Sequence, residues 1–225
     1  PNGSAPWQVV QVDIVHLHET ASGREKAVIF YDRFSRDVEA FAVSADVSTI
    51  TVLNLILYEI IPRHGWMRVL LSDRGSNIIS TLAQSFYDAF KVDLRPGDSH
   101  MHTVVGGCER FNATLRDLAR ATHFDTNYHW DAVLPLLVLH YKASIQETTG
   151  YSPFYLNHGR EPTFPWDINL MPPTGSDSQA AHVRDCLAQV HLAWQITRGH
   201  VSRVEQQRKF LHDRKYRQET LQKGN

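Results

Sequence analysis

The order of the periodic segments in this sequence predicts an α/β domain built on a mixed sheet. Three strand-like segments come first, and a helix, a strand, a helix and a strand then alternate before the chain continues in helices. The apolar fraction of 42% is high enough for a real core, and 225 residues suit one large domain or one domain with an appendage. No run of 18 apolar residues occurs, so we expect no membrane span, and the polar N-terminus has no signal-peptide pattern.

Five segments are expected to form the sheet because they are short and rich in β-branched and aromatic residues. They cover residues 7–15, 26–34, 37–44, 67–72 and 92–95. The first alternates apolar and polar residues before it becomes apolar, as a strand does. Ser22 and Gly23 mark the turn before the second. The sequence therefore predicts a five-stranded sheet flanked by helices.

Four segments have helical periodicity before the chain reaches a Pro-rich stretch. They cover residues 47–62, 77–91, 109–122 and 129–144. The apolar face of the first is expected to contain Val47, Ile50, Leu53, Leu57 and Ile61. Pro62 and Gly65 are expected to end that helix.

Two further patterns bear on the helical half of the chain. Trp130, Leu134, Leu137 and Tyr141 recur at helical spacing, which is more typical of a core or an oligomer face than of a cofactor site. Residues 96–107 begin with Pro96-Gly97 and end with Gly106-Gly107, so we expect a loop there.

Charge divides the chain into an acidic part and a basic part. Residues 1–179 carry 14 Lys and Arg against 20 Asp and Glu, whereas residues 180–225 carry 9 against 4. We expect a core domain at 1–162, a Pro-rich linker at 163–178 and a basic helical extension at 179–225. The basic part can contact phosphate, although a solvated charged helix would have the same composition.

Three acidic residues stand at positions where their side chains can converge. Asp13 lies in the first expected strand, Asp73 follows the fourth, and Glu109 begins an expected helix. Converging carboxylates repel one another, and divalent cations such as Mg²⁺ relieve that repulsion through hard oxygen ligands. The pattern predicts a two-metal site for phosphodiester chemistry.

Each acid also has a structural interpretation. Asp13 in an apolar strand could form an ion pair or a cap, because a buried carboxylate needs a partner. Asp73 could only form a turn before Arg74-Gly75. Glu109 could simply be a first-turn acid that interacts with the helix dipole.

The same acids carry a resemblance to a known family. Thirty-five residues separate Asp73 from Glu109, and the acids lie within stretches such as Leu71-Ser72-Asp73-Arg74-Gly75 and Glu109-Arg110-Phe111-Asn112. The other matching stretches are Tyr31-Asp32-Arg33-Phe34-Ser35-Arg36, Thr148-Thr149-Gly150-Tyr151-Ser152-Pro153-Phe154 and Gly159-Arg160-Glu161-Pro162. From about Trp7 to Pro162 the chain resembles the catalytic core of retroviral and long-terminal-repeat retrotransposon integrases, especially the gypsy-like ones.

The resemblance implies a ribonuclease H-like fold and a metal-dependent polynucleotidyl transferase. It implies that Asp13, Asp73 and Glu109 are catalytic and hold two Mg²⁺ or Mn²⁺ ions, with Asp13 contacting both. The implied reactions are 3′-end processing and DNA strand transfer in the nucleus, by a homo-oligomer acting on double-stranded element and target DNA. We expect DNA contacts from Gly106, Arg110, Asn112, Arg208, Lys209, Arg214, Lys215 and Arg217.

The loop at 100–108 departs from the family pattern, in which Pro, Gln and Asn are usual before the glutamate. Gly106 matches the family glycine, but those three residues are absent. Because this loop helps to hold DNA in the family, two alternatives stay open. One is a domesticated or decayed integrase that binds DNA or protein without catalysis, and the other is a ribonuclease H-like nuclease.

Histidine and cysteine usage gives weaker indications. His16, His18, His100 and His102 have pairs at i, i+2 without a Cys-x-x-Cys, so a zinc site among them is not favoured. Cys108 is expected to be a packed residue, and two cysteines suggest a reducing compartment. The resemblance implies a His-His-Cys-Cys zinc domain that would precede Pro1, so a fragment of a longer protein is expected.

Overall fold

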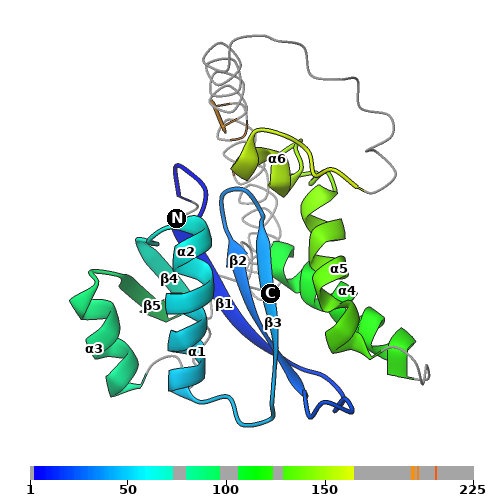
Figure 1. Cartoon of the computed structure of the whole chain (residues 1–225). Coiled ribbons are helices and arrows are strands. Elements are labelled where there is room, and N and C mark those ends of the chain that lie inside the picture. The colour runs from blue at the N-terminus through cyan, green and yellow to red at the C-terminus, as the bar shows by residue number, and fades with distance from the viewer. Residues whose placement is uncertain are drawn as a thin grey trace, which may run out of the picture.

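The computed structural model describes residues 3–72, 80–96, 106–123 and 129–164, together with residues 194, 195, 197 and 206. One five-stranded sheet organises this part of the chain (Figure 1). Its strands are β1 (Val9–His16), β2 (Lys26–Asp32), β3 (Val38–Val43), β4 (Val69–Ser72) and β5 (Asp93–Pro96), in the spatial order β3-β2-β1-β4-β5. β1, β2 and β3 are antiparallel neighbours, whereas β4 runs parallel to β1 and to β5. The predicted mixed α/β sheet is confirmed.

Helices cover both faces of the sheet. They are α1 (Thr49–Leu55), the π-helical segment η1 (Ile56–Ile60), α2 (Ile61–His64), α3 (Thr81–Ala89), α4 (Gly106–His123), α5 (Trp130–Ala143) and α6 (Pro153–His158). Ser48 and Ser80 cap α1 and α3, because their hydroxyls accept hydrogen bonds from the Thr51 and Ala83 amides. Figure 1 shows α1 and α2 on one side of the sheet and α4 and α5 on the other.

The helix predicted at 47–62 ends at Gly65 as expected, but it does not stop at Pro62 and its buried face differs from the prediction. It continues through Pro62 to His64 and ends at Gly65, whose φ of 79° requires glycine. In a regular α-helix, proline lacks an N–H to donate and its ring clashes with the carbonyl four residues earlier. The wide turn of η1, just before Pro62, accommodates the proline ring. The predicted stripe is also wrong at Ile50, which is 58% exposed. The buried positions are Val52, Ile56 and Ile60.

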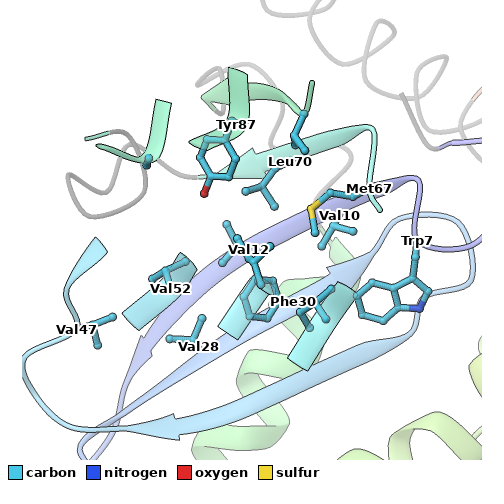
Figure 2. Packing of buried hydrophobic residues seen from close by; sticks show 14 of the residues in the cluster. Trp7, Val10, Val12, Val28, Phe30, Val47, Val52, Met67, Leu70 and Tyr87 are labelled. Atoms are coloured by element: carbon cyan, nitrogen blue, oxygen red, sulfur yellow. The ribbon is translucent and has the colours of Figure 1, made fainter. Parts of the chain in front are cut away.

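Alternation along the strands creates two separate cores. On one face, Val10 and Val12 of β1 pack with Phe30 of β2, with α1 and η1, and with Leu70 and Tyr87 (Figure 2). On the other face, Val15, Ala27, Ile29, Tyr31 and Val38 pack against α4 and α5. The stripe predicted in α5 is confirmed as core, because Trp130 and Leu134 are buried there and Leu137 and Tyr141 pack against the same cluster.

Trp194 of the C-terminal segment contacts the core. The indole N–H of Trp194 donates a 2.8 Å hydrogen bond to the Leu156 carbonyl in α6, and its ring packs edge-on against Phe34. Most of the predicted linker at 163–178 and of the helical extension at 179–225 lies outside the described residues, so those boundaries stay predictions. Among the described helices, none combines the length and the apolar character that a membrane crossing requires.

Candidate active site

Asp13 lies near the middle of the sheet, on the face that packs against α4. Strand alternation places it with Val15, because Val12 and Ile14 point into the opposite core. Its Oδ1 accepts a 2.8 Å hydrogen bond from the Ile14 amide, and its Oδ2 accepts a 2.6 Å hydrogen bond from Asn112 Nδ2. Because Asn112 is only 4% exposed, its amide group holds the Asp13 carboxylate in one orientation.

The start of α4 lies directly on β2. The helix begins at Gly106, so the expectation that Gly106-Gly107 ends a loop is wrong. A Cβ on Gly107 would overlap the Tyr31 hydroxyl and lie 2.6 Å from its Cζ. Glycine therefore allows α4 to approach the sheet closely enough for Asn112 to reach Asp13. Glu109 lies in the first turn of α4 with an exposed side chain, one helical turn before Asn112.

Cys108, the residue before Glu109, is buried. Burial raises the pKa of its thiol to about 12, and the negative charges of Asp13 and Glu109 add to the increase. A thiol with so high a pKa is protonated and unreactive at neutral pH, which confirms the expectation that Cys108 is a packed residue.

Asp73 lies outside the described residues. The strand that precedes it is described, and the parallel register pairs Ser72 with Val12. Ser72 and Val12 are the residues immediately before Asp73 and Asp13 in the sequence. Within the described ranges, no three His, Cys, Asp or Glu side chains form a group that could hold a metal ion, so the complete triad stays a prediction.

The predicted DNA contacts are only partly within the described residues. Arg110 is exposed on α4 and available to a ligand, whereas Asn112 is buried and turned toward Asp13. The basic residues predicted to contact DNA in the C-terminal segment lie outside the described residues. They are Arg208, Lys209, Arg214, Lys215 and Arg217.

A buried polar turn between β2 and β3 was not assigned a role from the sequence. The Asp32 carboxylate accepts hydrogen bonds from the Ser35 amide at 2.8 Å and the Ser35 hydroxyl at 2.6 Å. Burial raises the pKa of Asp32 to about 6 despite these bonds. In the sequence, this turn falls within the stretch Tyr31–Arg36, which matches the integrase family but had been given no role.

An ionic network next to this turn joins four elements. Lys142 of α5 donates a 2.6 Å hydrogen bond to Glu39 of β3 and lies 3.6 Å from Asp37. His64 Nε2 is 3.0 Å from the same Glu39 carboxylate. Asn157 of α6 donates to Asp37 at 3.1 Å, so the network ties α6 to the sheet.

Burial opposes ionisation of Glu39, but the His64 hydrogen bond and the Lys142 charge outweigh it and lower the pKa of Glu39 to about 2. The contact between Glu39 and Lys142 connects residues 103 positions apart, which no local pattern could predict.

Comparisons with known proteins found distant relatives of this chain. The chain is 26% identical over 197 residues to the Gag-Pol polyprotein of avian reticuloendotheliosis virus, covering 88% of this chain and 16% of the polyprotein. It is 27% identical over 198 residues to the Pol polyprotein of radiation murine leukemia virus (strain Kaplan), covering 85% of this chain and 33% of that protein. The search against protein-family models found no match.

Solved structures share the fold. The magnesium complex of the HTLV-2 integrase catalytic core domain, in its trimeric form, superposes with a TM-score of 0.57 at 16% identity, covering 69% of this chain and 99% of that one. A simian T-cell lymphotropic virus intasome in complex with a PP2A regulatory subunit gives 0.60 at 18% identity, covering 80% of this chain and 61% of that one.

The chain therefore resembles retroviral integrase catalytic cores in its fold and is distantly similar in sequence to retroviral polyproteins. Its five-stranded sheet with flanking helices is the ribonuclease H-like fold of integrase cores, as the sequence predicted. The chain spans only 16% and 33% of the length of these two polyproteins.

Proposed function

We propose that this domain is the catalytic core of a DNA integrase, which trims the 3′ ends of element DNA and joins them to target DNA. The observation that carries the proposal is the meeting of β1 and α4, where Asn112 orients Asp13 and Glu109 lies one turn earlier on the same helix. β4 brings Ser72, the residue before Asp73, beside β1. The distant homology to retroviral polyproteins supports the same activity.

The donor atoms fit a divalent metal ion. The two oxygens of Asp13 offer about four lone-pair sites, of which the Ile14 amide and Asn112 occupy two, so each oxygen keeps a free site. Glu109 is exposed on the same side of the sheet and adds a second hard oxygen ligand. We propose that Asp13, Asp73 and Glu109 together hold Mg²⁺ or Mn²⁺, as the magnesium complex of the HTLV-2 core suggests.

The chain's own residues would orient the reactants around this site. Asn112 fixes the rotamer of Asp13, and the protonated Cys108 thiol contributes packing without acting as a nucleophile. Exposed cations such as Arg110 would bind DNA phosphates and hold the scissile bond against the carboxylates. A divalent ion bound there would supply activation of a water or a 3′-hydroxyl and would neutralise developing negative charge.

We extend the proposal to the partners and the location. Double-stranded DNA is the substrate, a homo-oligomer is the active form, and the nucleus is where target DNA would be met. The trimeric HTLV-2 core and the simian T-cell lymphotropic virus intasome support the assembly.

The test is a gel assay with labelled duplex DNA in Mg²⁺ or Mn²⁺. The wild-type chain should give both nicked and joined products. Asp13→Asn and Asp73→Asn should lose both products while DNA affinity stays unchanged, because each removes a ligand charge but keeps the side-chain shape. Asp117→Asn is the matched control, since Asp117 is an exposed acid on α4 that pairs with Arg120.

The products also separate the rival functions. Nicking without joining would favour a ribonuclease H-like nuclease, and DNA binding without either product would favour a non-catalytic integrase derivative. Turnover of Asp73→Asn close to the wild-type rate would show that Asp73 is not a metal ligand.

A further inference from the structure

Phe34 and Leu156 are apolar residues that are buried outside both cores and meet at Trp194. Phe34, in the turn between β2 and β3, is 2% exposed, and Leu156 of α6 is fully buried. Among the described residues, neither side chain joins the two clusters that pack on the faces of the sheet. The indole N–H of Trp194 donates a 2.8 Å hydrogen bond to the Leu156 carbonyl, and its ring lies edge-on to Phe34 at 6.1 Å between centroids. We call Phe34 and Leu156 together the docking surface.

Polar contacts of its own hold the docking surface in place. The Asp32 carboxylate accepts hydrogen bonds from the backbone amides of Phe34 at 3.3 Å and Ser35 at 2.8 Å. Asn157, which follows Leu156 in α6, donates a 3.2 Å hydrogen bond to the Ser35 hydroxyl. Because these bonds join the turn to α6 without the C-terminal segment, the docking surface is preorganised for whatever packs on it.

The described residues around Trp194 present one face of a helix. Trp194, Gln195 and Thr197 are helical, and positions three apart lie on the same side of a helix. Thr197 is fully buried, and the indole of Trp194 is half-buried with its one polar atom satisfied. An aromatic side chain that packs its ring and pairs its polar group in this way is typical of an anchor at an interface.

The chain that follows Trp194 is strongly basic. Residues 195–225 carry 8 Lys and Arg against 3 Asp and Glu, whereas the carboxylates of Asp13 and Glu109 repel DNA. Basic residues that neutralise phosphates supply sequence-independent DNA affinity. Two DNA-contacting parts that are fixed relative to each other bind one duplex more tightly than either part alone, because the second contact becomes intramolecular. A docked Trp194 therefore gives the acidic site a neighbour that can hold phosphates.

We propose that the docking surface and Trp194 form an intramolecular anchor, which holds the basic C-terminal segment on the core so that both bind the same DNA duplex. The DNA half of this proposal rests on the proposed function, whereas the docking half is independent of it. The anchor also gives a role to the buried polar turn between β2 and β3, because the Asp32 carboxylate holds the backbone of Phe34 beneath the indole.

Hydrogen exchange of the full chain, followed by mass spectrometry without DNA, tests the docking. Trp194→Ala should make the amides of residues 32–37 and 153–158 exchange about tenfold faster, the order expected when a hydrogen bond and a ring contact are lost. Trp66→Ala removes an exposed indole that stacks on Phe90, and it should leave both peptides unchanged. Trp194→Phe keeps a ring without the N–H donor, so its rates should lie between those of Trp194→Ala and the wild type. This variant preserves the test if Trp194→Ala fails to fold.

Fluorescence anisotropy with duplexes of increasing length tests the role of docking in DNA binding. From about 8 to about 30 base pairs, the wild-type affinity should rise as one duplex becomes long enough to reach both parts. Trp194→Ala should match the wild type on the shortest duplex and bind the longest about tenfold more weakly, because the connecting chain alone then relates the two parts. Trp66→Ala should follow the wild type at every length.

The combined results separate the anchor from the proposed catalysis. Equal exchange rates and equal DNA affinities for Trp194→Ala and Trp66→Ala would overturn the anchor. Faster exchange with unchanged DNA affinity would keep the docking and overturn its role in DNA binding. A smaller assembly of Trp194→Ala in light scattering would place the docking between copies of the chain and overturn an intramolecular anchor. A wild-type chain that docks Trp194 but forms no product in Mg²⁺ would overturn the proposed catalysis alone, because the exchange measurement needs neither DNA nor metal.

Discussion

The side-chain amide of Asn112 donates a 2.6 Å hydrogen bond to the carboxylate of Asp13, joining residues that are 99 positions apart. This bond links the helix that carries Glu109 to the strand that carries Asp13. It gives Asn112 a positioning role toward Asp13, where the sequence had suggested a DNA contact.

We expect Asn112→Ala to lower metal affinity or metal-dependent turnover by about 10–100-fold, because partners of ligating carboxylates have effects of that size. DNA binding without metal should stay near the wild-type value. Asn54→Ala, at an exposed position on α1, is the control. Titration calorimetry with Mn²⁺ provides the measurement, and an affinity equal to that of Asn54→Ala would show that the hydrogen bond does not orient the site.

Gly107→Ala should separate α4 from β2, because its Cβ would overlap the ring of Tyr31. Overpacking of this kind costs about 1–3 kcal/mol, and the displaced helix should also lose activity. Tyr31→Phe removes the hydroxyl that lies closest to the new methyl group. The double variant should therefore be more stable than the sum of the two single changes predicts, as measured by urea unfolding. Strict additivity would mean that the helix relaxes without contacting Tyr31.

Much of the fold could be predicted because it follows from local periodicity. The strands alternate as expected, and Trp130 and Leu134 pack where the helical stripe placed them. The π turn at Ile56–Ile60 could not be predicted, because it depends on how one helix accommodates Pro62 while still packing on the sheet. The start of α4 was predicted three residues late, because two consecutive glycines usually indicate a loop. Here Gly107 lies inside the helix, where the close approach to Tyr31 leaves no room for a side chain.

The candidate site was predictable in its acids but not in their partners. Asp13 and Glu109 were found through spacing and resemblance, which are properties of the chain. The role of Asn112 and the pairing of Glu39 with Lys142 depend on contacts between distant segments. Asp73 and the basic C-terminal residues lie outside the described residues, so their roles stay predictions.

The Glu39 network predicts a pH-dependent contribution to stability. The pKa of Glu39 is lowered from 4.5 to about 2, so its contribution is present above about pH 4.5 and is lost as the pH falls toward 2. At pH 7, Glu39→Gln should lower the free energy of unfolding by on the order of 3 kcal/mol. The difference from wild type should shrink steadily between pH 4.5 and pH 2 in urea titrations. A difference that stays constant with pH would show that charge is not the cause.

The basic C-terminal segment should contribute to DNA affinity. Deleting residues 203–225 should weaken binding at low salt and flatten its salt dependence, with each lost phosphate contact lowering the slope by about 0.9. A full-length variant with Gln at the basic positions predicted to contact DNA in this segment keeps the chain length. If the deletion weakens binding and the Gln variant does not, the segment acts through assembly rather than through phosphate contact.

Successive side chains of β1 point to opposite faces of the sheet, and this alternation determines whether Asp13 can reach the candidate active site. Asp13 faces α4 only because Val12 and Ile14 occupy the opposite core, and a shift of one residue would exchange the two faces. The packing of the apolar residues around Phe30 and Leu70 therefore fixes the register of β1, and with it the direction in which the Asp13 carboxylate points. Substitutions in that core that preserve folding but allow β1 to shift by one residue would abolish activity, because the Asp13 side chain would then point into the apolar core on the opposite face.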